Sequence, residues 1–158
     1  MTIRVVTPEN FPPPLKEIPD PPAELYVEGV LPSLEQRWLT VVGARKCSSY
    51  GREVCQQLLT DLAGWPIVIV SGLALGIDTL AHQTALKTGL LTVAVPGSGL
   101  NRAVLHPHTN IRLADTIIER GGALLSEFPP DYPAGIHTFP RRNRIMAGLS
   151  RAVLIIEA

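Results

Sequence analysis

Two features of this sequence could hold an anion: a glycine-rich turn and a cluster of arginines. In the turn, Gly72 and Gly76 interrupt the stretch SGLALGID, which runs from Ser71 to Asp78 between an apolar segment and a helix-like one. Glycines at this place leave backbone N–H groups bare at a helix N-terminus, where a phosphate is most easily held. The turn has neither the GxGxxG spacing nor the GK[ST] of a P-loop. It therefore predicts a backbone phosphate site that could serve a nucleotide or a nucleic acid.

The arginine cluster is the strongest electrostatic feature of the chain. No acid occurs between Asp131 and Glu157, whereas this window holds Arg141, Arg142, Arg144 and Arg151, with Asn143 among them. Three rings lie close by in the sequence, on Tyr132, His137 and Phe139. Guanidinium groups bind phosphates and rings stack on bases, so this composition favours a single-stranded nucleic acid. The alternative is a solvated basic helix start, which the helix dipole disfavours unless an anion or a carboxylate such as Glu127 lies nearby.

Two more turns with possible chemistry follow apolar runs. Arg45 lies just after Gly43 and beside Lys46, and its planar fork could clamp a phosphate. The competing interpretation is a surface arginine paired with a local carboxylate. The other turn could be a second backbone anion loop or an ordinary tight turn, and its residues are Gly97, Ser98 and Gly99.

Pairs of polar residues elsewhere favour structural roles over catalysis. Asp78 and His82 are spaced i,i+4 on a predicted helix, so we expect a hydrogen-bonded pair that fixes the helix rather than a catalytic dyad. Ser126-Glu127 follows a predicted strand, and we expect a helix cap or a charge partner there rather than acid–base catalysis.

The elements that position these residues alternate along the chain. Apolar runs predict strands at 38–43, 67–70, 91–95, 123–125 and 152–156. Helical patterns predict helices at 50–63, from about 77 to a C-cap at Gly89, at 111–120 and within 139–150, with Ser48 or Ser49 capping the first. This alternation predicts an α/β fold: a three-layer, doubly wound, mostly parallel sheet. Because every turn named above follows a strand, all should lie at one edge of that sheet.

The first 36 residues differ from the rest in composition and charge. Eight prolines lie between Thr7 and Pro32, which predicts an extended arm rather than a helix, packed on the core through its apolar residues. Residues 1–36 contain two bases and six acids, a net charge of −4, and residues 37–158 contain 12 bases and eight acids, +4. We expect a proline-rich arm at 1–36 and one Rossmann-like domain at 37–158.

Composition excludes several protein classes. With 158 residues, 46% of them apolar, the chain should fold around a core, and it has neither a run long enough to cross a bilayer nor a signal-peptide pattern. Cys47 and Cys55 form no CxxC pair, and the spacing of His106 and His108 across a proline is a weak metal signal. We therefore predict a cytoplasmic protein with no metal and no cofactor. The chain stops directly after a predicted strand, so we expect it to be a fragment of a longer protein.

Taken together, the motifs resemble those of the DNA-processing protein A family, also called Smf. The matching blocks, in order, are VVGAR (41–45), SGLALGIDTLAH (71–82), VPGSGL (95–100), LLSEFPP (124–130), FPRRNRIMAGLS (139–150) and LIIEA (154–158). The resemblance implies an extended Rossmann-like fold in a bacterial cytoplasmic protein that binds single-stranded DNA without catalysing a reaction. It also implies loading of the RecA recombinase during natural transformation, and a homodimer of the full-length protein.

The resemblance also assigns residues. Arg45 matches the arginine of the family's GxR motif, which contacts DNA phosphate, and Gly72 and Gly76 match its glycine loop. The family's RNR motif corresponds to Arg142, Asn143 and Arg144. Two positions depart from the family pattern: Leu75 stands where many members have a lysine in the glycine loop, and His106 stands where an aromatic residue commonly precedes the proline.

A second hypothesis places the chain among enzymes. Pro96-Gly97-Ser98-Gly99 is similar to the start of the PGGxGTxxE loop of nucleoside-monophosphate phosphoribohydrolases of the lysine-decarboxylase-like Rossmann group. The sequence then diverges at Leu100-Asn101, and no glutamate follows in register. Release of free base from a nucleoside monophosphate would distinguish this enzyme from a DNA-binding protein.

Overall fold

Parallel strands form the centre of the sheet in the computed structural model, which describes residues 2–158. They are β3 (Arg37–Gly43), β4 (Ile67–Ser71), β5 (Leu91–Ala94), β6 (Ala123–Ser126) and β7 (Ala152–Ile156), in the order β6-β5-β4-β3-β7. Branched and apolar residues make up most of these runs because the inner strands, β3 to β6, are covered on both faces, whereas Val153 and Ile155 of the edge strand β7 are exposed. The prediction of a mostly parallel sheet is confirmed.

The strand order reverses at β3. From β3 the chain proceeds outward through β4, β5 and β6, and then returns to add β7 on the other side of β3. Ligands of doubly wound sheets bind at such a switch point, outside the carboxyl ends of the strands. The turns after β3, β4, β5 and β6 all lie at this edge, as the sequence predicted.

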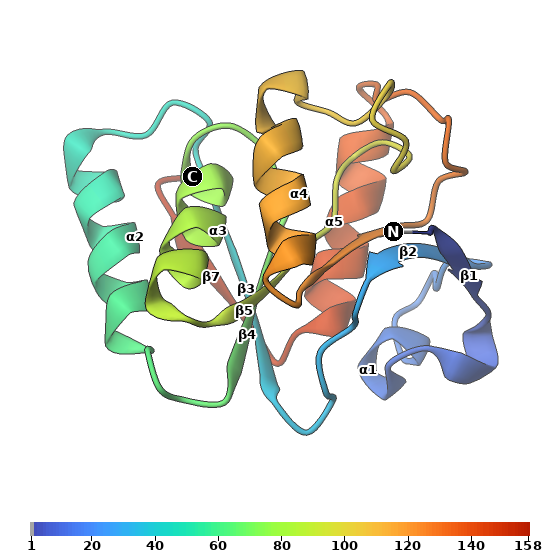
Figure 1. Cartoon of the computed structure of the whole chain (residues 1–158), viewed down its shortest axis with the longest axis horizontal. Coiled ribbons are helices and arrows are strands. Elements are labelled where there is room, and N and C mark those ends of the chain that lie inside the picture. Colours follow the sequence, from blue (N-terminus) through green and yellow to red (C-terminus); the bar gives the residue numbers. More distant parts are fainter. Residues whose placement is uncertain (1) are drawn as a thin grey trace.

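Helices cover both faces of the sheet, which confirms the three-layer fold (Figure 1). On one face lie α2 (Ser49–Asp61), α3 (Ile77–Thr88) and α4 (Ile111–Glu119), packed over two apolar clusters. On the other face, α5 (Thr138–Leu149) and the short α1 (Pro13–Lys16) share a third cluster with Trp38, Val70 and Val93. Residues of α5 therefore approach the site from the face opposite to α3.

Local sequence explains where two of the helices begin and end. The side chain of Ser48 accepts a hydrogen bond from the Gly51 N–H and caps α2, and Gly89 ends α3 in the left-handed conformation. Gly76 precedes α3 with φ of 80° and ψ of −126°. A Cβ there would lie 2.3 Å from the Ala44 carbonyl oxygen, so only glycine lets the turns after β3 and β4 approach this closely.

The N-terminal segment is more regular than its prolines suggested. Two strands extend the sheet beyond β6: β2 (Leu25–Gly29) pairs antiparallel with β6, and β1 (Arg4–Val6) pairs antiparallel with β2. A 3-10 helix spans Pro8–Asn10. The expectation that this segment forms no helix was wrong at α1 (Pro13–Lys16). Prolines occupy the first turn of α1, where a backbone N–H has no helical partner to lose.

Candidate nucleic-acid interface

A pair of adjoining pockets lies at the carboxyl edge of the sheet, beside the switch point. The smaller, of about 100 Å³, is lined by Arg45, Gly72, Ala74, Leu75, His106, Pro107, Phe139 and Arg142. The larger, of about 380 Å³, shares Arg45, Ala74, Phe139 and Arg142 with it and extends along β3 and α5 to Asn143, Met146 and Val153. Residues from the turn after β3, the turn after β4 and the start of α5 therefore converge, although they lie up to a hundred positions apart in the sequence.

Arg45 is the exposed cation of these pockets. Its guanidinium carbon lies 4.9 Å from the centroid of the Phe139 ring, and among residues 2–158 it forms no ion pair. A guanidinium that stacks on a ring keeps its in-plane N–H donors available for an anion. His106 packs against the same ring at a centroid distance of 5.6 Å. In the sequence Phe139 is only a neighbour of the arginine cluster, and the tertiary structure places its ring against both Arg45 and Arg142.

Arg142 is buried, with only 6% of its surface exposed. One Nη atom donates to the Gly72 carbonyl at 2.7 Å and to the Val95 carbonyl at 2.9 Å, and Nε donates to the Asn143 side-chain oxygen at 2.9 Å. Burial lowers the pKa of Arg142, while the nearby Asp78 carboxylate opposes that shift. This arginine therefore braces the ends of β4 and β5 and adds positive charge behind the pocket wall.

Asp78 holds the other side of the glycine turn. Its carboxylate accepts the Gly72 N–H at 3.0 Å, and burial raises the pKa of Asp78 although Arg142 and the hydrogen bonds act against that shift. The expected pair between Asp78 and His82 was wrong. His82 Nδ1 bonds the Thr92 hydroxyl on β5 at 2.7 Å, because the buried ring points from α3 toward the sheet rather than along the helix.

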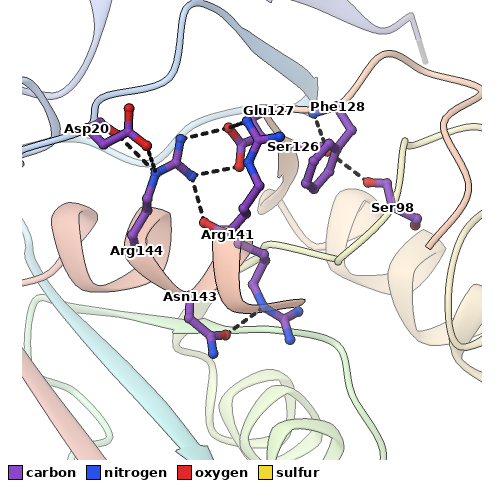
Figure 2. A network of polar contacts seen from close by, with 9 residues as sticks. Asp20, Ser98, Ser126, Glu127, Phe128, Arg141, Asn143 and Arg144 are labelled. Atoms are coloured by element: carbon purple, nitrogen blue, oxygen red, sulfur yellow. Dashed lines mark hydrogen bonds and ion pairs between the residues drawn. The ribbon is translucent and has the colours of Figure 1, made fainter. Parts of the chain in front are cut away.

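Arg144 belongs to a salt-bridge network around one buried acid (Figure 2). Its two Nη atoms donate to the two oxygens of Glu127 at 2.6 and 2.8 Å, and its Nε lies 3.4 Å from an Asp20 oxygen. Arg141 reaches the same Glu127 at 3.3 Å. The charge-partner role expected for Glu127 is confirmed. The guanidinium of Arg144 is bonded within the protein and does not line the pockets.

The remaining predicted residues divide between surface and interior. Arg141, Asn143 and Lys46 are exposed, whereas Ser71 is buried and donates its hydroxyl to the Val41 carbonyl. The turn Gly97-Ser98-Gly99 is buried too: a Cβ on Gly97 would lie 2.5 Å from the Phe139 ring, and Ser98 accepts the His106 N–H. The structure therefore places this turn beneath Phe139, as support for the ring.

Neither membrane nor metal features accompany the pockets in the part of the chain that the structure describes. No helix within residues 2–158 is long and apolar enough to cross a bilayer. In the same range, no three His, Cys, Asp or Glu side chains are grouped so that they could hold a metal ion. His106 instead packs on Phe139.

Comparison with known sequences gives close relatives. Protein Smf of Escherichia coli K12 is 47% identical over 150 residues, which make up 95% of this chain and 40% of that protein. DNA processing protein DprA of Streptococcus pneumoniae R6 is 45% identical over 145 residues, 91% of this chain and 50% of that protein. The chain thus spans about half the length or less of these relatives.

Solved structures agree with the sequences. The X-ray structure of DNA processing protein A from S. pneumoniae matches with a TM-score of 0.89 at 38% identity, over 100% of this chain and 55% of that one. A structure of the Helicobacter pylori protein, described for its single-stranded DNA binding mode, matches with a TM-score of 0.83 at 31% identity, over 96% of this chain and 68% of that one. The model of the family described as DNA recombination-mediator protein A matches residues 2–158. The chain belongs to this family, as its motifs predicted.

Proposed function

We propose that this protein binds single-stranded DNA at the carboxyl edge of its sheet, without catalysing a reaction. The observation that carries the proposal is Arg45, an exposed guanidinium stacked on Phe139 at the mouth of two pockets and unpaired with any acid among residues 2–158. A cation on a ring presents donors to a phosphate and a stacking surface to a base at once. The single-stranded DNA binding described for the H. pylori relative supports the same assignment.

The predicted site residues contribute in different ways to this proposal. Arg45, Lys46, Arg141 and Asn143 are the exposed groups that would meet the strand. Gly43, Gly72 and Gly76 would act indirectly, because each faces protein atoms and lets the turns pack closely. The bare backbone N–H expected at Gly72 is instead bonded to the Asp78 carboxylate. The other predicted residues would hold the pocket walls in place, and the arginines among them would add positive potential. They are Ser71, Arg142, Arg144 and the turn Gly97-Ser98-Gly99.

In the longer proteins of this family, we propose that this unit presents single-stranded DNA to the RecA recombinase in the cytoplasm during natural transformation, as a homodimer. The family description, DNA recombination-mediator protein A, supports the mediator role. Residues 37–158 would form the DNA-binding domain, with residues 1–36 as an arm that braces it. The mediator role is tested by whether the protein accelerates assembly of RecA on single-stranded DNA.

The enzyme hypothesis has less support. A nucleoside-monophosphate hydrolase needs a carboxylate free to act on the ribose, and the carboxylate that lines the larger pocket, Asp78, already accepts the Gly72 N–H. We expect no free base to be released from nucleoside monophosphates, and clear turnover would favour the enzyme.

Binding itself is tested by fluorescence anisotropy with labelled oligonucleotides across a salt series. Single-stranded DNA of different sequences should bind with similar affinity, and the logarithm of the association constant should fall linearly with the logarithm of salt, by about 0.7 per phosphate neutralised. Absence of binding, or binding that salt does not weaken, would overturn the proposal.

A further inference from the structure

A second group of rings lies beside the pockets, in the segment before α5. The Phe128 and Tyr132 rings are stacked, with centroids 5.2 Å apart and planes at 19°, and His137 meets the edge of Tyr132 at 6.4 Å. The Tyr132 hydroxyl lies 3.2 Å from His137 Nε2. Phe128 is buried beneath, Tyr132 is half-buried and His137 is exposed, so the group presents its outer rings to solvent.

Backbone hydrogen bonds hold this group in place. The Tyr132 N–H donates to the Pro129 carbonyl at 2.9 Å, and the Tyr132 carbonyl accepts the Gly99 N–H at 2.8 Å. The Phe128 N–H donates to the Ser126 hydroxyl, which in turn donates to the Ser98 carbonyl (Figure 2). A surface whose rings are already positioned loses little conformational entropy when a ligand binds.

Charge and apolar exposure on this surface fit a nucleotide. Arg141 lies over Phe128, with its guanidinium carbon 5.6 Å from the ring centroid, and it is 56% exposed while its contact to Glu127 is 3.3 Å long. Ile136 is 91% exposed, so nearly the whole of its apolar side chain is available to contact a base. The exposed acid nearby, Asp131, accepts a hydrogen bond from the Asn101 amide. Rings with an arginine suit a base and its phosphate, as in other proteins that bind single strands.

The ring group is continuous with the pockets. Arg141 is adjacent to Arg142 in the first turn of α5, and Phe139, which forms a wall of both pockets, lies just before them. The turn beneath Phe139 is the one whose Gly99 N–H bonds Tyr132. A strand that leaves the pockets past Phe139 therefore has this surface next in its path.

We propose that Tyr132, Ile136, His137 and Arg141 form a second nucleotide subsite, at which a base stacks on the rings and Ile136 while Arg141 binds its phosphate. This inference rests on the proposed function, since it extends the path of the same single-stranded DNA beyond the pockets at Arg45. The subsite lengthens the bound segment and adds affinity only for strands long enough to reach it.

The test compares oligothymidylates of about 4 and about 12 nucleotides, within the range of site sizes of single-strand binding folds. Tyr132→Ala should weaken binding of the long strand by about fivefold to thirtyfold, the equivalent of about 1–2 kcal/mol for a lost stacked base, and should leave binding of the short strand unchanged. Tyr132→Phe, which keeps the ring and loses the hydroxyl, is the matched control and should bind both strands like the unmodified protein.

Ile136→Ser provides a variant that cannot disturb the fold, because its side chain is exposed. It should also weaken binding of the long strand selectively. A 2-aminopurine base moved along the long strand should be quenched by the unmodified protein at one position beyond the pocket, and Tyr132→Ala should abolish that quenching.

The outcomes separate the two proposals. If the unmodified protein binds neither strand, both the proposed function and the subsite are wrong. If the unmodified protein binds both strands and all three variants bind them with the same affinity, DNA binding at the pockets is supported and the subsite is refuted. If Tyr132→Ala and Ile136→Ser weaken both strands equally, these residues belong to the pocket itself, which also refutes a separate subsite.

Discussion

Asp78 and Arg142 hold the two polar groups of one residue, Gly72. The Asp78 carboxylate accepts its N–H at 3.0 Å, and the Arg142 guanidinium donates to its carbonyl at 2.7 Å. A buried carboxylate and a buried guanidinium each cost several kcal/mol to desolvate, and each lowers that cost for the other. The pair fixes the glycine turn between β4 and α3, and with it the wall of the pocket.

Arg45→Ala should weaken binding of single-stranded DNA without changing thermal stability. Arg45 is exposed and unpaired among residues 2–158, so its loss removes a phosphate contact but no buried interaction. We expect all sequences to be weakened alike and the salt slope to fall by about 0.7. Anisotropy across a salt series measures this. Arg151→Ala, at the opposite end of the sheet, is the control, and equal effects of the two variants would contradict a site at Arg45.

Gly72→Ala should destabilise the protein. A Cβ at this position would lie 2.5 Å from Nη1 of Arg142 and 2.7 Å from Oδ2 of Asp78, so the buried pair must shift. We expect a loss of about 1–3 kcal/mol in the free energy of unfolding, measured by denaturant titration.

A double variant with Arg142→Ala is the control for Gly72→Ala. Arg142→Ala removes the guanidinium atoms that the new methyl group meets and gives the Asp78 carboxylate room to move, so the two substitutions together should cost less than the sum of the separate costs, by about 0.5 kcal/mol or more. Strict additivity would mean that Gly72 is needed for another reason.

Glu127→Gln and Asp20→Asn should lower the free energy of unfolding by different amounts, although each removes a carboxylate partner of Arg144. The Glu127 side chain is 5% exposed and bonds both Nη atoms, whereas Asp20 is 83% exposed. We expect Glu127→Gln to lower the free energy of unfolding by about 3 kcal/mol, because it removes the buried charge that balances Arg144 and leaves only the exposed Asp20. Asp20→Asn should cost no more than about 0.5 kcal/mol. Denaturant titration of both variants checks this, and similar costs would show that burial does not set the strength of this network.

His82 should make the protein less stable in acid. Burial lowers the pKa of His82 to about 3 from 6.5, and its Nδ1 bonds Thr92. Because the folded pKa lies below the unfolded one, the unfolded state binds more protons in this window, and stability falls as pH falls from about 6.5. The loss should reach about 2–3 kcal/mol by about pH 4.5.

His82→Asn tests the assignment of this acid sensitivity. The asparagine amide can still donate to Thr92 but does not titrate, so the decline in thermal stability between about pH 6.5 and 4.5 should become shallower. An unchanged decline would place the sensitivity in other groups.

Periodicity and turn chemistry were enough to predict most of the fold. β-branched runs, the Ser48 cap and Gly89 are local signals, because a strand buried on both faces and a helix terminus are decided within a few residues. The same signals missed β2 (Leu25–Gly29), whose run is short and lies in a proline-rich segment, and α1 (Pro13–Lys16), whose prolines occupy the one helical turn that tolerates them.

The sequence by itself determined that the turns with Arg45, Gly72 and Arg142 share one edge, since the carboxyl ends of parallel strands lie together. Only the tertiary structure decided which arginine meets solvent. Arg142 and Arg144 are bonded to carbonyls and carboxylates in turns that lie far away in the sequence, while Arg45 packs on Phe139 with its donors free of acidic partners among residues 2–158. The physical reason is that a guanidinium's role depends on which acceptors surround it, and those acceptors are brought close by packing rather than by neighbours in the chain.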